Sequence, residues 1–338
     1  MAVSIASGLD HPSLLVLLAD GRLHSGEWLA QELGVSRAAV WKGIERLRMR
    51  GIDVDAVPRR GYALPGGAVE LLEEGRIRSA VASERAARLR SLDLKFDVDS
   101  TNTRLLAAAP PPVGYADVML SELQHAGRGR RGRHWIAPFG CGVALSMGWS
   151  FTDASKASPT LSLSVGVAVA RALARAGALG LGLKWPNDIW LGERKIGGVL
   201  IELRAEAGGP AHVVIGVGVN VILAPATRAQ IEAVGVQVAA VADACTAPPS
   251  RNFIAGAIID ELLSMLADFE REGFAAFRAA WTALDVLRDR PAQVLTGENV
   301  ISGTARGVNA HGALQLEREG RLHEFVSGEV SLRGMGSI

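Results

Sequence analysis

The stretch from Gln124 to Trp135 is dense in residues that bind anions. It reads Gln-His-Ala-Gly-Arg-Gly-Arg-Arg-Gly-Arg-His-Trp, with four arginines set among glycines. The glycines match the dinucleotide pattern G-x-G-x-x-G, but that pattern needs a helix after it, which Pro138 and Gly140 disfavour. A solvated surface loop is the plain alternative, although so many like charges repel one another unless an anion joins them. We therefore predict a glycine-hinged loop that approaches a ligand closely and binds a polyphosphate through its arginines.

A second cluster, Lys184 to Asp188, places a lysine, an asparagine and an aspartate around a Trp-Pro turn. Asp188 is a candidate Mg²⁺ ligand, and Lys184 and Asn187 are candidates for contacts with phosphate or ribose groups. A turn capped by the asparagine and the aspartate explains the same residues without a ligand.

Two glycine-rich stretches follow this cluster. Lys195 precedes Ile-Gly-Gly and offers a point positive charge where the chain can pass close to a ligand. Residues 215–220 read Ile-Gly-Val-Gly-Val-Asn, a strand with little side-chain bulk that ends at the polar Asn220. Tight packing in the core is the alternative for this strand.

The motifs of several other chemistries are missing from the sequence. It contains no G-x-S-x-G, no H-E-x-x-H and no P-loop, so a bound nucleotide would need another arrangement. Cys141 and Cys245 have neither metal-ligand spacing nor the density of a disulfide scaffold. We interpret them as ordinary semi-buried side chains.

Length and composition predict a soluble chain of more than one domain. At 338 residues, with 49% hydrophobic and 21% charged residues, the chain exceeds what one core usually holds. Its most apolar stretch, 161–182, is interrupted by Arg171 and Arg175, so we expect no signal peptide, no membrane span and a cytoplasmic location. The formal net charge of +1 argues against nucleic-acid binding along the whole chain but permits a local basic face.

Residues 1–66 predict a compact helical unit followed by a hairpin. The first helix starts near Pro12 and the second near Ser25, and Ser36 suits the N-cap of a third helix. That third helix has inward-facing residues at helical spacing, namely Val40, Ile44 and Leu47. Three helices with a tight turn before the third are typical of a helix-turn-helix domain.

Two short strands, 52–57 and 62–64, flank the basic turn Pro58-Arg59-Arg60-Gly61 and predict a wing. A small helical domain with a solvated basic face is the alternative. We favour a winged helix-turn-helix that binds DNA through its third helix and the tip of the wing. The predicted DNA-binding residues are Ser36, Arg37, Trp41, Lys42, Arg59 and Arg60.

Residues 67–284 predict an α+β domain with a mixed sheet, because apolar strand-like runs alternate irregularly with helical ones. The strand candidates are 92–98, 118–123, 143–151, 196–203 and 213–221. Helices are expected over 69–89, 158–177, 228–245 and 250–280. Residues 285–338 predict a small β-barrel with turns at Gly297-Glu298-Asn299 and His311-Gly312. The chain is thus expected to have three domains.

Five motifs together resemble the signature set of biotin-protein ligases, in that family's order. They are Ser100-Thr101-Asn102, the loop 124–133, the cluster 184–188, the stretch 195–198 and the strand 216–220. With the winged head and the C-terminal barrel, the resemblance covers nearly the whole chain and points to the bifunctional biotin ligase and biotin-operon repressor group. It implies a central fold like class II aminoacyl-tRNA synthetase cores and a C-terminal SH3-like barrel.

The chemistry that this resemblance implies has two steps. The biotin carboxylate attacks the α-phosphate of Mg-ATP to give biotinyl-5'-AMP, and a lysine of the biotin carboxyl carrier protein of acetyl-CoA carboxylase then takes the biotinyl group. The implied catalytic residues are Lys195, Arg130 and Asp188. The implied biotin-binding residues are Ser100, Thr101, Asn102, Gln124, Arg128, Gly129, Arg130 and Lys195. The implied ATP and Mg²⁺ residues are Arg130, Lys184, Asn187, Asp188 and Asn220, with Asp188 as the metal ligand.

The resemblance also implies regulation, in which biotinyl-5'-AMP acts as corepressor and orders a homodimer on operator DNA. Two departures from the repressor-type pattern are visible. The stretch Gly235-Val236-Gln237 lacks the aromatic residue that covers adenine there, and the third helix of the head carries the bulky Trp41 where a polar base-reading residue is expected. The alternatives are a sensing regulator without catalysis, disfavoured by Lys195 and the arginine loop, and a lipoate ligase, disfavoured by the loop and the barrel.

Overall fold

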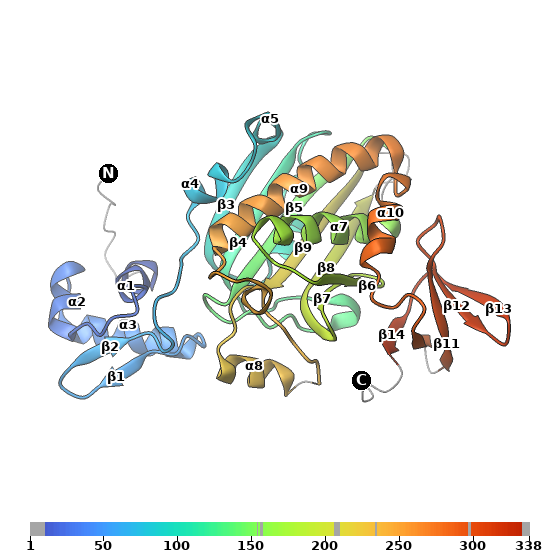
Figure 1. Cartoon of the computed structure of the whole chain (residues 1–338). Coiled ribbons are helices and arrows are strands. Elements are labelled where there is room, and N and C mark those ends of the chain that lie inside the picture. Colours follow the sequence, from blue (N-terminus) through green and yellow to red (C-terminus); the bar gives the residue numbers. More distant parts are fainter. Residues whose placement is uncertain are drawn as a thin grey trace. The chain divides into compact units, whose positions relative to one another are not determined.

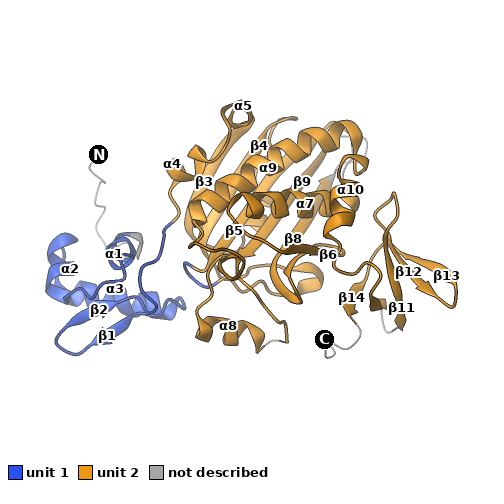
Figure 2. Cartoon of the chain, in the orientation of Figure 1, with its two compact units in different colours: residues 1–71, 138–140 blue, residues 72–137, 141–338 orange. Residues whose placement is uncertain are grey.

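The computed structural model describes residues 11–153, 155, 158–205, 210–233, 235–296 and 299–332. Contacts divide the chain into two compact units, one of residues 1–71 with 138–140 and one of residues 72–137 with 141–338 (Figure 2). The predicted turn residues Gly297 and Glu298 lie outside the described residues. None of the described helices is long and apolar enough to cross a membrane.

The first unit is a winged helix-turn-helix, with helices α1 (His11–Leu18), α2 (Gly26–Glu32) and α3 (Arg37–Met49). The predicted cap at Ser36 is confirmed, since its side chain accepts a hydrogen bond from the backbone N–H of Ala39. Ser25, near which the second helix was expected to start, caps α2 in the same way by accepting from the backbone N–H of Trp28. The predicted inward residues of α3 are fully buried against α1 and α2, and they are Val40, Ile44 and Leu47.

The predicted wing is confirmed as a hairpin of β1 (Asp55–Val57) and β2 (Gly61–Ala63), which pair antiparallel. Arg59 in the turn has a φ of 63°, a left-handed conformation that suits a tight turn. Arg48 of α3 donates two hydrogen bonds to the carbonyl of Val54, which fixes the chain between the helix and the wing.

The second unit is built on a mixed seven-stranded sheet in the order β3-β4-β5-β9-β8-β7-β6, seen in Figure 1. Its strands are β3 (Leu89–Val98), β4 (Ala116–Gln124), β5 (Gly142–Phe151), β6 (Leu181–Lys184), β7 (Asp188–Leu191), β8 (Arg194–Ala205) and β9 (Ala211–Asn220). Only the β3–β4 pair is parallel. The predicted α+β class and mixed sheet are confirmed.

The two faces of this sheet have different roles, because successive side chains of a strand point to opposite faces. On one face, Leu145, Met147 and Ile215 join the main core beneath helices α7 (Thr160–Arg175) and α9 (Arg251–Glu272) (Figure 1). The alternate residues, such as Ser146 and Gly216, turn to the other face, which helix α6 (Thr101–Ala107) partly covers. The second face is therefore free to hold polar groups.

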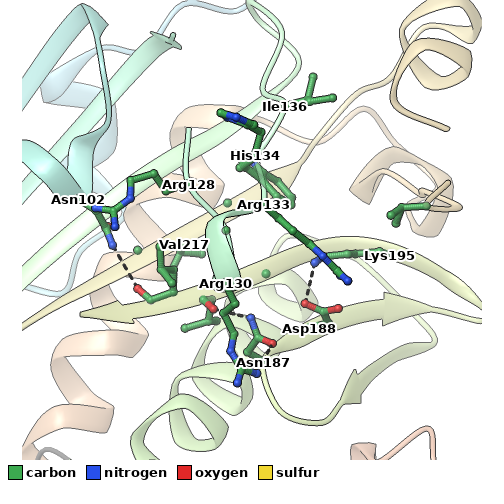
Figure 3. A pocket seen from close by; sticks show the side chains of 18 of the residues that line it. Asn102, Arg128, Arg130, Arg133, His134, Ile136, Asn187, Asp188, Lys195 and Val217 are labelled. Atoms are coloured by element: carbon green, nitrogen blue, oxygen red, sulfur yellow. Dashed lines mark hydrogen bonds and ion pairs between the residues drawn. The ribbon is translucent and has the colours of Figure 1, made fainter. Parts of the chain in front are cut away.

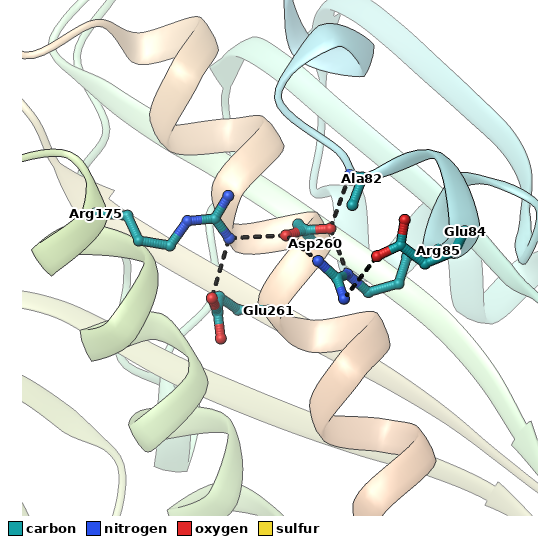
Figure 4. Close-up of polar contacts among 6 residues, drawn as sticks. All are labelled: Ala82, Glu84, Arg85, Arg175, Asp260 and Glu261. Carbon is teal, nitrogen blue, oxygen red and sulfur yellow. Dashed lines mark hydrogen bonds and ion pairs between the residues drawn. The ribbon is translucent and has the colours of Figure 1, made fainter.

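A buried ion-pair network ties the helices of the first face together (Figure 4). Asp260 of α9 is 1% exposed and accepts hydrogen bonds from Arg85 at 2.6 Å and 3.0 Å, from Arg175 at 2.7 Å and from the backbone N–H of Ala82 at 3.0 Å. Burial alone would raise the pKa of Asp260, but these hydrogen bonds outweigh it and leave the pKa below its ordinary value. The network joins the segment after α4 (Glu74–Ser79), helix α7 and helix α9.

The C-terminal part consists of α10 (Ala275–Leu284) and a five-stranded antiparallel sheet in the order β13-β12-β11-β10-β14. Its strands are β10 (Pro291–Thr296), β11 (Asn299–Val308), β12 (Leu314–Arg318), β13 (Arg321–Phe325) and β14 (Glu329–Leu332). The predicted turn at His311-Gly312 is confirmed.

Three helix predictions were wrong in extent. Residues 69–89 form two short helices, α4 and α5 (Ser83–Ala86), rather than one. The span 228–245 is helical only in α8 (Pro225–Glu232) and in a single 3₁₀ turn, Val241–Ala244, because the intervening chain pairs with β8 instead. The span 250–280 breaks at Gly273, whose φ of 63° ends α9 before α10 begins.

Candidate functional site

A cavity of about 220 Å³ opens on the second face of the seven-stranded sheet (Figure 3). All twelve residues that the sequence predicts for ligand binding and catalysis line it, namely Ser100, Thr101, Asn102, Gln124, Arg128, Gly129, Arg130, Lys184, Asn187, Asp188, Lys195 and Asn220. The residues come from segments up to 120 positions apart in the chain, between Ser100 and Asn220. The fold therefore brings the separate motifs into one site.

One end of the cavity is neutral and buried. Ser100, Thr101 and Asn102 begin helix α6 and are each less than 5% exposed. Gln124, at the end of β4, accepts a hydrogen bond at 2.9 Å from the backbone N–H of Thr101. Ser146 of β5 bonds both Thr101 and Asn102 through its hydroxyl. This end offers hydrogen-bonding groups without a net charge.

Two glycines of β9 form the floor at this point. A Cβ at Gly216 would lie 2.4 Å from Oδ1 of Asn102, and a Cβ at Gly218 would lie 2.5 Å from the Trp135 ring. Real Cβ atoms do not approach so closely, so a larger residue at either position would push a cavity-lining side chain away. The glycines of this strand thus make room for the site. Tight packing in the core, the alternative for this strand, explains only Val217 and Val219, which belong to the main core.

The glycine-rich loop crosses the cavity as a short 3₁₀ turn at Arg130–Gly132. A Cβ at Gly127 would lie 2.4 Å from the carbonyl oxygen of Trp135, so the loop closes on itself only with glycine there. Arg130 donates to Oδ1 of Asn187 at 3.3 Å (Figure 3), and burial lowers its pKa from the ordinary arginine value. A half-buried guanidinium that has no carboxylate in hydrogen-bond contact among the described residues is well suited to an anionic ligand.

The other end of the cavity carries the opposed charges. Lys195 of β8 pairs with Asp188 of β7 at 2.7 Å, as Figure 3 shows. Lys184 lies with its amine 4.2 Å from the centre of the Trp190 ring, and burial lowers its pKa to about 8. Asn187 donates to the carbonyl of Val199 at 2.7 Å, which holds the turn between β6 and β7 in place.

Asn220 and the segment after α8 close the cavity beside β9. The amide of Asn220 donates to the carbonyl of Ala239 at 3.2 Å. Val236 stands where an aromatic residue was expected to cover a bound base, and it is 36% exposed. It lines the cavity together with the aliphatic Ile231 and Val238. The apolar surface that faces the cavity here is aliphatic.

Sequence reasoning missed several residues of the site, among them Trp135, Ser146, Glu202 and Glu329. Trp135, Ser146 and Glu329 line the cavity, and Glu202 lies behind its wall. Glu329, from β14, pairs with Arg133 of the loop and places the C-terminal sheet at the cavity. Trp135 was within the loop motif and could have been included, whereas the other three carry no local signal.

The six predicted DNA-binding residues belong to the first unit. All of them, Ser36, Arg37, Trp41, Lys42, Arg59 and Arg60, are exposed. Trp41 is 55% exposed at the surface of α3, although an indole buries readily in a core. An exposed aromatic among basic side chains is suited to a contact outside the unit.

Family models match three parts of the chain. The biotin/lipoate A/B protein ligase family model matches residues 96–220, an HTH domain model matches residues 13–63, and a biotin protein ligase C terminal domain model matches residues 289–333. The three matched segments contain the central site, the winged head and the C-terminal sheet, respectively.

The chain is also similar to curated proteins and solved structures. The bifunctional ligase/repressor BirA of Salmonella typhimurium is 40% identical, over 95% of this chain and 97% of that protein. The protein of the same name from Escherichia coli is 39% identical, over 95% and 96%. The biotin protein ligase from Aquifex aeolicus in complex with biotin and ATP has a TM-score of 0.61 at 26% identity, covering 72% of this chain and 99% of that one.

Proposed function

Because the chain belongs to the biotin/lipoate A/B protein ligase family, and within it to the bifunctional ligase/repressors, we propose that it is an ATP-dependent biotin-protein ligase. It forms biotinyl-5'-AMP and transfers the biotinyl group to a lysine of a biotin carboxyl carrier protein, the activity of a biotin-[acetyl-CoA-carboxylase] ligase. The observation that carries the proposal is the polarity of the cavity, which is neutral and buried at Thr101 and Asn102 and cationic at Lys195 and Arg130. A substrate with a neutral ring and a distant carboxylate fits that distribution.

The first step brings two anions together. A carboxylate oxygen of biotin attacks the α-phosphorus of ATP, and the bond to the β-phosphate oxygen breaks, so that pyrophosphate leaves with the electron pair. The carboxylate needs no general base, so the site contributes positioning and positive charge. Lys195 serves the biotin carboxylate and the α-phosphate oxygens, and Arg130 serves the phosphate from the loop above.

The second step transfers the acyl group. The amine of the acceptor lysine attacks the acyl carbon of biotinyl-5'-AMP, AMP leaves, and the ammonium proton passes to solvent. A mixed anhydride hydrolyses when exposed to water, so the loop of Arg128, Gly129 and Arg130 protects the intermediate while it covers the site.

The ring of biotin occupies the neutral end. Ser100, Thr101, Asn102 and Gln124 supply the donors and acceptors that a buried ureido group requires, since an unpaired polar group would be costly there. Arg128 and Gly129 cover this end from the loop, and Lys195 lies at the far end for the carboxylate.

ATP occupies the opposed-charge end. Arg130, Lys184, Asn187 and Asn220 would contact phosphates and ribose, and Asp188 would hold Mg²⁺. Among the described residues no group of three or more His, Cys, Asp or Glu side chains could hold a metal alone. Mg²⁺ commonly binds through one or two carboxylates together with substrate phosphates, so a single Asp188 beside the phosphates fits that mode. The ion would neutralise phosphate charge.

A direct test is pyrophosphate release from Mg-ATP, measured with and without biotin. We expect release that depends on biotin, and biotin incorporation into a carrier protein that lipoate does not compete away. Well-folded protein that releases no pyrophosphate with biotin would contradict the ligase and favour a sensing regulator.

The head makes the chain a biotin-responsive repressor, with biotinyl-5'-AMP as corepressor and operator DNA as partner. A homodimer would let two heads contact two half-sites. Among the described strands, residues 200–205 of β8 pair only with β9, because the pairing with β7 ends at Gly198 and Asn187 occupies the backbone groups of Val199. Such an open edge supports pairing with a second copy. A gel shift on the chain's own upstream DNA should strengthen when biotin and ATP are added, and a shift indifferent to both would contradict this role.

The division of labour follows the three predicted domains. Residues 1–66 bind DNA, residues 67–284 bind biotin and ATP in a core like those of class II aminoacyl-tRNA synthetases, and residues 285–338 form an SH3-like barrel. The five-stranded antiparallel sheet and the bulge in β11 between Ala305 and Val308 support the barrel, since bulges bend strands.

A further inference from the structure

Glu202 of β8 lies behind the neutral end of the cavity without lining it. One carboxylate oxygen accepts a hydrogen bond from Nδ2 of Asn102 at 2.9 Å, and the other pairs with Arg128 at 2.8 Å. Both partners line the cavity, and Figure 3 shows them side by side. The Glu202 side chain is 19% exposed. A single carboxylate thus contacts both the wall of the cavity and the loop that covers it.

The contact with Glu202 fixes which way the Asn102 amide points. Nδ2 of Asn102 donates to Glu202 and, at 3.3 Å, to the carbonyl of Leu200. A carboxylate and a carbonyl can only accept, so both N–H groups of the amide are directed away from the cavity. Oδ1 must then face Ser146, whose hydroxyl donates to it. The buried amide has no other arrangement that satisfies these neighbours.

The orientation of the Asn102 amide also fixes the direction of the hydrogen bonds at Ser146 and Thr101, which line the same wall of the cavity. Ser146 has one hydroxyl proton, which goes to Asn102, so the hydrogen bond of 2.7 Å between Ser146 and Thr101 must take its proton from Thr101. Thr101 in turn has a single hydroxyl proton, so its 3.2 Å contact with Oε1 of Gln124 is secondary to the 2.7 Å bond to Ser146, and its oxygen keeps lone pairs for a ligand. The wall therefore presents acceptors to whatever occupies this end.

We propose that Glu202 is a positioning residue that sets the hydrogen-bond direction of this wall, so that it accepts the N–H groups of a neutral cyclic urea. The inference rests on the proposed biotin ligase function and adds to it the origin of the pocket's selectivity for an N–H donor. Without the Glu202 carboxylate, the longer 3.3 Å contact with the Leu200 carbonyl would be left to orient the Asn102 amide, so the reversed network would compete with the one that suits the ligand.

The test compares Glu202→Gln with the wild type. Glutamine has the same size and can still accept from Arg128, but its amide can donate to Asn102 and so permits the reversed network. We expect biotin binding, measured by calorimetry without ATP, to weaken about tenfold, while the KM for ATP stays within twofold. Glu261→Gln is the matched control, because Glu261 is also 19% exposed and pairs with an arginine at 3.0 Å, outside the cavity.

A double-mutant cycle asks whether Glu202 acts through the wall. Ser146→Ala removes the hydroxyl that connects Asn102 to Thr101. In that background, Glu202→Gln should lower the affinity for biotin less than twofold. A full tenfold loss in that background would overturn the proposal and place the effect on Arg128 instead. Unchanged biotin affinity in Glu202→Gln, an equal loss in Glu261→Gln, or an equal rise in the KM for ATP would overturn it too.

Neutron diffraction of deuterium-exchanged wild-type crystals tests the direction without any variant. We expect deuterium on the side of Asn102 that faces Glu202, and a Ser146 deuterium directed at Asn102. The reversed arrangement would overturn the proposal even if Glu202→Gln fails to fold. A wild type without biotin-dependent pyrophosphate release would instead contradict the proposed ligase function, so the two failures are distinguishable.

Discussion

Lys195 and Asp188 form an ion pair of 2.7 Å in the cavity, with each side chain 23% exposed. The pair lies over Gly198, where a Cβ would come within 3.3 Å of the Lys195 amine and 3.4 Å of an Asp188 oxygen. The amine proposed for the biotin carboxylate is thus held by the carboxylate proposed for Mg²⁺. Under the proposed function, a bound anion would take the place of Asp188 beside Lys195, and a bound cation would take the place of Lys195 beside Asp188, so that neither charge would be left alone.

Replacing Lys195 by alanine should lower biotin-dependent pyrophosphate release about 10²- to 10³-fold, because the developing negative charge loses its cation. Single-turnover release of pyrophosphate measures this step directly. Lys95→Ala is the control, since Lys95 also pairs with an aspartate, at 3.0 Å, but lies on β3 outside the cavity. A decrease of less than threefold in the Lys195 variant would remove it from the proposed role.

Lys184 predicts a pH dependence. Burial lowers its pKa to about 8, and a lysine is cationic below its pKa, so the ligand-free site loses this charge as pH rises through 8. We expect kcat/KM for ATP, which reports the free enzyme, to fall above about pH 8. In Lys184→Arg the charge persists and the fall should disappear. Identical profiles for the two proteins would exclude Lys184 as a phosphate contact.

Arg130→Gly should release reactive adenylate, because the loop then covers the intermediate less well. The expected result is increased biotin labelling of a bystander protein, such as serum albumin, detected with streptavidin. Arg321→Gly, at an exposed arginine of β13, should label no more than wild type. Equal bystander labelling by Arg130→Gly and wild type would argue against the covering role.

Asp260→Asn should destabilise the second unit by about 2–3 kcal/mol, since it leaves two arginines and a backbone N–H with a weaker acceptor. Asp268→Asn, on the same helix, removes an exposed pair with Arg271 and should cost under about 1 kcal/mol. Urea unfolding measures both variants. Equal losses of unfolding free energy in the two variants would show that burial of Asp260 adds nothing to stability.

The same network predicts an acid dependence. The folded-state pKa of Asp260 lies below its ordinary value of 3.8, so its contribution is complete above that value and is lost as pH falls through the folded pKa. Wild type and Asp260→Asn should therefore differ in urea unfolding at neutral pH, and the difference should shrink as pH falls below 3.8. A constant difference over that range would contradict the assignment.

The sequence by itself determined the features that depend on neighbouring residues. The helix starts at Ser25 and Ser36 and the helical spacing of Val40, Ile44 and Leu47 are local signals, so these helices of the head were predicted from the sequence. The five apolar strand candidates are long buried runs, and each is a strand. The motif residues were also visible, because glycines, arginines and lysines gather there within short stretches of the chain.

The tertiary structure alone decided what depends on partners distant in the chain. The short β6 and β7 are strands only because they pair with each other and with β8, and the expected helix at 228–245 gives way because Lys195 exchanges backbone hydrogen bonds with Gln237 and Ala239. The places of Glu202 and Glu329 at the site follow from their contacts with Asn102 and Arg133, which lie 100 and 196 positions away in the chain. Backbone hydrogen bonds and ion pairs of this kind join segments that are distant in the chain. The sequence of one segment does not show which other segment it will contact in the fold.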